Sequence, residues 1–390
     1  MSQAPEERRA EPAWTEFAQN LVPLLRDHAT RTEERCRPTE EVVAALRDAG
    51  MLRLETPREL GGAGADLPTQ MSVCAELARG CPSTAWLVGI NSTGKELALT
   101  KFSSVTREIL RENPDSYFAT VGNVSASAVR TNGGYRVTGR GGFASGCEVA
   151  DWVIVWAIPS ADSEQQLVSV VVPASQVKIE RTWNTAGMCG TGSHTVVVED
   201  VFVPEIYTAV SQFEAATNSF SDLPQPQQLL RAIAIEVPAL VGAAHGAFDV
   251  VRQSFAAGKS IADTVYTRMS DSPSARHWLA QARHDIDSAY AHMGIVADAL
   301  AAYSLNEPMR LDARLRVRMH MASAVTLSRQ AVSKLLDLGG ASSFSRSHPL
   351  QRFWRDLEVG SRHARLNPYI AMEDYGRHLA AEEAPTAVLV

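Results

Sequence analysis

The chain is organised around one stretch near its C-terminus, His348-Pro-Leu-Gln-Arg-Phe-Trp-Arg-Asp-Leu-Glu-Val-Gly-Ser-Arg-His363. Pro349 favours a helix start, because proline is well tolerated in the first turn of a helix. The large apolar residues that follow recur at helical spacing and predict one face buried in a core: Leu350, Phe353, Trp354 and Leu357. Gly360 weakens this helix and Pro368 stops it. The pattern therefore places His363 in the last turn or just after it.

His363 is the first candidate for chemistry. Imidazole titrates near neutral pH, and the negative end of a helix favours its charged form. A histidine in this place can hand a proton to a substrate. It can equally be a surface residue that caps the last carbonyl groups of the helix. The local pattern alone is compatible with both.

Composition and charge narrow the class of protein. The chain has 390 residues, 45% hydrophobic and 21% charged, which predicts two or three well-packed domains. The net charge of -7, with dispersed Lys and Arg, argues against nucleic acid or an anionic membrane as the partner and favours a small-molecule enzyme. Five cysteines without CxxC spacing favour reduced thiols and no metal site. A charged N-terminus and no apolar run of membrane-spanning length favour a soluble, cytoplasmic protein.

The sequence pattern changes twice along the chain. Period-2 patterns rich in β-branched residues predict four strands: Tyr135–Gly139, Trp152–Ile158, Leu167–Pro173 and His194–Pro204. Longer segments rich in Ala and Leu predict helices: Leu229–Val251, Ser274–Ala302 and Ala313–Leu338. We expect a mainly α protein with an N-terminal helical domain (1–116), a central β-domain of barrel or sandwich type (117–222) and a C-terminal four-helix bundle (223–390). No GxGxxG or P-loop motif is present, and a doubly wound sheet is not expected.

Several separated motifs together resemble one fold family. Gly187–His194 and the following Val198–Pro204 resemble the flavin-contacting part of the acyl-CoA dehydrogenase fold. Leu338–Gly340 resembles the glycine pair of that fold, and Arg355-Asp356 resembles the Arg-Asp that precedes its active site. Gly139–Gly146 resembles the corresponding segment of the flavin-dependent monooxygenases built on this fold. Those proteins are the group D oxygenase components of two-component systems, and the similarity covers nearly the whole chain.

The position of the usual dehydrogenase base separates the two branches of this fold. In the dehydrogenases a glutamate commonly stands nine residues after the Arg, and that position is Ala364 here. Alanine cannot remove a proton, and Glu358 stands at the wrong offset. The oxygenases resemble this sequence in carrying a histidine where His363 stands. A dehydrogenase remains an alternative, since some dehydrogenases take their base from another helix.

The resemblance implies a set of flavin contacts. Ser145 matches the serine that contacts flavin N5 in the oxygenases, so it becomes the second catalytic candidate after His363. Thr191 and Ser193 offer hydroxyl groups to the flavin. Gly339 and Gly340 suit close approach to a phosphate of a flavin bound across a subunit boundary.

Three positions depart from the related oxygenases. Gly141 stands where a bulky aromatic residue is frequent, which implies a roomier substrate pocket. Asn91 stands where phenol hydroxylases often carry a histidine, and an amide cannot deprotonate a phenol. Cys189 replaces a frequent arginine, so one flavin contact is missing or supplied elsewhere. Trp183 either lines the flavin plane or packs in the core.

The expected function is that of the oxygenase component of a flavin-dependent monooxygenase, a homotetramer by resemblance. FMNH2 or FADH2 from a separate NAD(P)H:flavin reductase reacts with O2 to a C4a-hydroperoxyflavin, which hydroxylates a small, aromatic or polycyclic substrate. The absence of a nucleotide-binding loop agrees with an outside supply of reduced flavin. Three alternatives remain: an N-oxygenase of an amine or amino sugar, a flavin dehydrogenase, and a non-catalytic ligand-binding scaffold.

Overall fold

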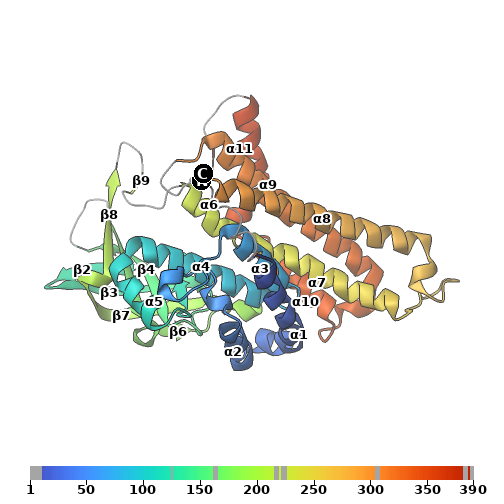
Figure 1. Ribbon diagram of the computed structural model, residues 1–390, viewed down its shortest axis with the longest axis horizontal. Coiled ribbons are helices and arrows are strands. Elements are labelled where there is room, and N and C mark those ends of the chain that lie inside the picture. Colours follow the sequence, from blue (N-terminus) through green and yellow to red (C-terminus); the bar gives the residue numbers. More distant parts are fainter. Residues whose placement is uncertain are drawn as a thin grey trace, which may run out of the picture.

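A computed structural model describes residues 11–123, 126–160, 166–214, 219–220, 226–303, 308–380 and 385–386. It places a β-sheet at one end of the molecule and long helices at the other, with the N-terminal helices beside both (Figure 1). The N-terminal helices are α1 (Glu11–Arg35), α2 (Glu40–Asp48), α3 (Leu67–Ala78), α4 (Pro82–Lys101) and α5 (Ser103–Glu112). This is the acyl-CoA dehydrogenase-like arrangement that the motifs predict.

The strands form one mixed sheet, in the order β6-β7-β3-β2-β4-β5-β8-β9, with β1 parallel to β4. They are β1 (Phe118–Thr120), β2 (Ala126–Thr131), β3 (Gly134–Ala144), β4 (Trp152–Pro159), β5 (Gln166–Pro173), β6 (Lys178–Glu180), β7 (His194–Pro204), β8 (Thr208–Glu214) and β9 (Ser219–Phe220). The four predicted strands are confirmed as β3, β4, β5 and β7. β3 runs further than predicted, to Ala144, and so ends beside Ser145.

The C-terminal helices are α6 (Pro226–Ala234), α7 (Val237–Ala256), α8 (Pro273–Ala301), α9 (Leu311–Gly339), α10 (Pro349–Gly360) and α11 (Pro368–Ala380). α8 and α9 extend furthest from the sheet, and α7 runs along them (Figure 1). Glycine lets α7 pack closely on its neighbours: a Cβ added to Gly242 would collide with the backbone of Ala75 in α3, and one added to Gly246 would lie 2.6 Å from the Phe353 ring in α10. α7 is therefore the central helix of the molecule.

The prediction of one helix over Leu229–Val251 is wrong. The structure breaks it at Ile235–Glu236, between α6 and α7. Pro238 explains the break, because proline is tolerated only in the first turn of a helix, so a new helix begins at Val237. The expectation that no apolar run has spanning length also needs correction. The segment Gln227–Ala256 contains a stretch long and apolar enough to cross a membrane, but 94% of that stretch is buried inside the protein, as in a core helix.

The organising stretch folds as predicted. α10 begins at Pro349, and Leu350, Phe353 and Leu357 lie in the core while Trp354 is partly buried. The helix ends at Gly360, and His363 follows it in extended geometry, with φ -53° and ψ 134°. His363 is therefore outside the helix, where its side chain can reach other segments.

Candidate functional site

Ser145 stands at the end of a chain of hydroxyl groups. Its Oγ is 2.8 Å from Ser193 Oγ, which is 2.8 Å from Thr191 Oγ1, and Thr191 donates to the Met188 carbonyl at 2.8 Å. A hydroxyl has one proton, so Thr191 must accept from Ser193, and Ser193 must accept from Ser145. The lone pairs of Ser145 are therefore left to accept a further hydrogen bond. The structure thus brings three of the predicted flavin-contacting residues together.

Tight turns hold the two ends of this row of hydroxyl groups in place. Met188 and Gly192 have positive φ angles of 53° and 49°, which curl the segment between them. The Thr191 carbonyl then accepts the Gly146 N–H at 2.8 Å, joining the turn after β3 to the turn before β7. Both turns belong to the segments that resemble the flavin-contacting motifs.

Phe143 presents a flat apolar surface next to Ser145. Its φ of 58° is unusual for a bulky residue, and 69% of its surface is exposed. Its ring meets Trp183 edge to face at 5.9 Å, and Trp183 Nε1 donates to the Met188 carbonyl at 2.9 Å. An exposed ring beside a hydrogen-bond acceptor suits the flat ring system of a flavin. The sequence motifs did not indicate Phe143, and Trp183, for which they left two roles open, packs against the Phe143 ring here.

His363 pairs with a carboxylate from another part of the chain. Its Nδ1 lies 3.0 Å from Glu236 Oε2, at the break between α6 and α7. Burial lowers the pKa of His363, but the Glu236 charge outweighs it and raises the pKa above its ordinary value of 6.5. The Trp86 ring of α4 meets the imidazole at 5.9 Å, nearly edge to face. Sequence reasoning attributed the charge bias to the helix end, whereas the structure supplies Glu236.

α10, which ends three residues before His363, is fastened to the turn that carries the hydroxyl groups. Asp356 accepts the Met188 N–H at 2.6 Å, and Arg355 donates to the Ala186 carbonyl at 2.5 Å. A Cβ on Gly360 would lie 3.7 Å from Met188 Sδ. The Arg-Asp motif, eight and seven residues ahead of His363, therefore fastens the turn before β7 onto α10. Burial raises the pKa of Asp356 to about 7, although the Met188 N–H lowers it.

Gly339 and Gly340 lie elsewhere. Lys259, just after α7, donates to the Gly339 carbonyl at 3.0 Å, whereas Glu236 and His363 meet just before α7. A helix rises 1.5 Å per residue, so the two places are about 30 Å apart along this helix of 20 residues. Within one chain, the glycine pair and His363 therefore do not lie in the same site.

Asn91 and Gly141 have structural surroundings. Asn91 is fully buried, donates to the Leu52 carbonyl at 3.0 Å and accepts from the Phe118 N–H at 3.1 Å. Both halves of its amide are used, so it ties α4 to the segment between α2 and α3 and to β1. Gly141 is buried in β3, opposite Val196 of β7. The predicted substrate role of these two residues stays a prediction.

Cys189 does not replace the charge of the arginine that is frequent at its position. Its thiol donates to the Thr185 carbonyl at 3.0 Å, and burial raises its pKa to about 11. Among the described residues, no group of three or more His, Cys, Asp or Glu side chains could hold a metal ion.

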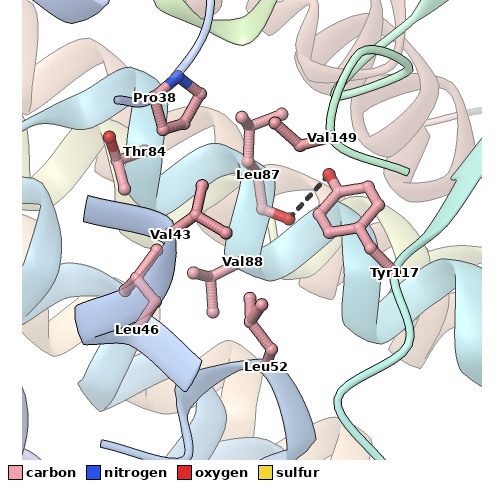
Figure 2. A pocket seen from close by; sticks show the side chains of 9 residues that line it. All are labelled: Pro38, Val43, Leu46, Leu52, Thr84, Leu87, Val88, Tyr117 and Val149. Carbon is pink, nitrogen blue, oxygen red and sulfur yellow. Dashed lines mark hydrogen bonds between the residues drawn. The ribbon is translucent and has the colours of Figure 1, made fainter. Parts of the chain in front are cut away.

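An apolar pocket lies on another face of α4 (Figure 2). It holds about 310 Å³ of empty space, part of it open to solvent, and is lined by Pro38, Val43, Leu46, Leu52, Thr84, Leu87, Val88, Tyr117 and Val149. At 3.6 residues per turn, Thr84, Leu87 and Val88 lie about 100° to 200° around the helix from Trp86. The pocket is therefore separate from the His363 side of α4.

The comparisons with known proteins agree with this geometry. Residues 4–106 match the model for the acyl-CoA dehydrogenase N-terminal domain, and residues 234–368 match that for the acyl-CoA dehydrogenase C-terminal domain. The oxygenase subunit HsaA of a flavin-dependent monooxygenase from Rhodococcus jostii is 33% identical over 381 residues, covering 91% of this chain and 95% of the relative. The chain belongs to the flavin-dependent monooxygenases of the acyl-CoA dehydrogenase fold.

Further relatives support the assignment of this chain to the flavin-dependent monooxygenases. The oxygenase component of an FADH(2)-dependent resorcinol hydroxylase from Rhizobium sp. is 30% identical, with 94% of both chains covered. The structure of XiaF from Streptomyces sp., solved with FADH2 and glycerol, superimposes with a TM-score of 0.87 at 32% identity over 98% of both chains. The monooxygenase is thus an oxidoreductase that uses reduced flavin, and as an oxygenase component it depends on a separate reductase. The predicted family, fold and cofactor class are confirmed.

Proposed function

We propose that this monooxygenase hydroxylates a small aromatic or polycyclic substrate, with Ser145 and His363 acting on the same flavin. The observation that carries the proposal is the pair of open polar atoms on two segments fastened together: the Ser145 oxygen, whose lone pairs are free, and the imidazole of His363. Bound reduced flavin supplies the electrons and activates oxygen. Ser145 would accept a hydrogen bond from its N5–H, and His363 would supply a proton.

Aromatic side chains favour an aromatic substrate over an amino sugar. Trp86 stands beside His363, and Phe143 stands beside Ser145. Rings pack well on flat apolar ligands, whereas a sugar needs many hydrogen-bond partners. Resorcinol, in the name of one relative, is such an aromatic compound. The proposed location is the cytoplasm.

A homotetramer completes the flavin site in this proposal. Gly339 and Gly340 lie near the opposite end of α7 from His363 in one chain. Gly340 has a φ of 69° and open space around its Cα, as expected for close approach of a ligand. We infer that the glycine pair of one copy contacts the flavin held by Ser145 of another copy. Analytical ultracentrifugation tests the assembly, and a monomer with full activity would contradict it.

The test of function combines the purified chain with chemically reduced FAD or FMN, oxygen and a panel of phenols, polycyclic phenols, indoles and amines. We expect oxygenated product from aromatic members of the panel and no oxidation of NADH or NADPH by the chain alone. Mass spectrometry identifies the product, and ¹⁸O₂ shows the source of its oxygen. Oxygenation of amines alone would establish the N-oxygenase alternative, and anaerobic bleaching of oxidised flavin by acyl-CoA would establish the dehydrogenase.

A further inference from the structure

Glu236 is a buried carboxylate with one cationic neighbour. Its side chain is only 6% exposed, and it lies in the two-residue break between α6 and α7. His363 Nδ1, at 3.0 Å, is the one cationic group within ion-pair distance of Glu236 among the described residues. An unpaired carboxylate in a buried position would lower the stability of the fold, so the contact with His363 compensates for the burial of Glu236.

The position of Glu236 decides which imidazole atom faces the site. A carboxylate beside Nδ1 keeps a proton on that atom, so Nε2 is the nitrogen that gains and loses a proton. Trp86 packs on the ring from α4 and limits its rotation. The His363 side chain keeps 37% of its surface exposed, and no hydrogen bond reaches Nε2 within the described part of the chain. Nε2 is therefore open to a ligand.

We propose that Glu236 is a positioning residue of the monooxygenase, holding Nδ1 of His363 so that Nε2 delivers a proton to an oxygen atom at the flavin site. This inference rests on the role of His363 in the proposed function. In the step, the Nε2–H bond breaks and an O–H bond forms, while the Nδ1 proton stays beside Glu236. The imidazole becomes neutral, and solvent returns the proton afterwards.

Two charged groups act on His363 in opposite directions. Glu236, from the break before α7, raises its pKa, and Arg365, in the turn Ala364–Leu366, lowers it. Trp86, the ring that packs on it from α4, is uncharged. Removal of the Glu236 charge leaves burial and Arg365, which both favour neutral imidazole. Because Glu236 is paired with His363, it is not a free carboxylate base.

The first experiment needs no flavin. NMR of the protein with ¹³C- and ¹⁵N-labelled histidine, assigned with His363→Asn, measures the pKa of His363. We expect Glu236→Gln to lower that pKa by about one unit or more and Glu236→Asp to keep part of the wild-type value. Asp285→Asn is the matched control, because Asp285 is equally buried and pairs with Lys334 at 2.6 Å. An unchanged His363 titration in Glu236→Gln overturns the proposal.

The second experiment measures the oxidation of reduced flavin by oxygen on the protein as a function of pH. We expect Glu236→Gln to move the His363-dependent limb to lower pH and to reduce the rate about tenfold or more at pH 8, with partial rescue by Glu236→Asp. Thermal unfolding of each variant separates misfolding from chemistry. A shifted NMR titration with an unmoved pH profile also overturns the positioning role. Failure of the proposed function shows itself differently, as wild-type protein that oxidises reduced flavin without oxygenating any substrate.

Discussion

His245 and His363 are the same residue type in opposite surroundings. His245 lies on α7 and faces α8, where Arg283 donates to its Nε2 at 3.2 Å and its Nδ1 lies 3.2 Å from the Tyr290 hydroxyl. Burial, followed by the charge of Arg79, lowers its pKa to about 4. Both nitrogens are occupied, and the ring is neutral at physiological pH.

His363 has one nitrogen in ion-pair contact and a raised pKa, because its neighbour is a carboxylate and not a guanidinium. The comparison teaches that the number of occupied nitrogens and the sign of the nearest charge separate a structural histidine from one equipped for proton transfer. Both features come from residues distant in the sequence. Four measurements test this difference between the two histidines.

The largest effect is expected at His363. His363→Ala should lower the rate of product formation about 100-fold to 10,000-fold, the usual range for a lost general acid. Stability should also fall, because Glu236 is left as a buried carboxylate without its partner, so thermal unfolding is recorded and turnover is measured below the transition. Stopped-flow oxidation of reduced flavin and product analysis measure the effect. A variant within threefold of wild type would place His363 with the structural histidines.

His245→Ala should show the reverse behaviour. Removal of the ring leaves the buried Tyr290 hydroxyl without its partner, whereas Arg283 keeps Asp287, so the expected cost is about 1 to 3 kcal/mol in the free energy of unfolding. Urea denaturation measures this cost. Product formation below the unfolding transition should stay at the wild-type level, and a catalytic loss in a stable variant would end the contrast.

The two histidines should also give stability opposite dependences on pH. The pKa of His245 is lower in the folded protein, so its contribution is complete above about pH 6.5 and is lost as pH falls towards 4, by at most about 1.4 kcal/mol per pH unit. The pKa of His363 is raised, so its contribution is complete below about pH 6.5 and is lost as pH rises through the folded-state pKa. Thermal unfolding of wild type against His245→Gln and His363→Gln measures each part. Equal pH dependence in all three proteins would contradict both assignments.

Ser145 extends the contrast to a hydroxyl group, whose proton is donated to Ser193 while its lone pairs stay free to accept a hydrogen bond. Ser193→Ala removes the acceptor of its proton, so Ser145 can turn its hydrogen towards the flavin. We expect product formed per NADH consumed in the coupled system to fall about fivefold, the equivalent of about 1 kcal/mol for one hydrogen bond. Peroxide and product are quantified together, with Ser104→Ala, at an exposed serine of α5, as the control. Unchanged coupling would mean that Ser145 holds its orientation without the hydroxyl chain.

Local periodicity predicted the framework of this molecule. α10 and the strands β3, β4, β5 and β7 lie where their apolar spacing indicated. Ser145, Thr191 and Ser193 could be named because each lies in a motif of its own. The break before α7 was missed because Pro238 interrupts an otherwise regular apolar pattern. Glu236 was missed with it, since a partner supplied by tertiary contact leaves no periodic signal.

Asn91 shows the limit of assignment by analogy. Its position in the sequence suggested a substrate contact, yet its fully buried amide is used by two backbone groups. Whether a buried polar side chain is satisfied depends on the loop and strand that pack against it. The sequence alone does not show how many hydrogen-bond partners such a side chain has.

At position 143, the backbone conformation lowers the stability of the fold, whereas the exposed aromatic ring favours ligand binding. A bulky residue with a φ of 58° costs about 1 to 2 kcal/mol that glycine would avoid, and its exposed ring gives the fold little in return. Variants screened for heat resistance alone should therefore accumulate glycine or asparagine at this position. Variants screened for turnover should keep an aromatic ring. The amino acid recovered at position 143 would thus report which selection a population of this enzyme has experienced.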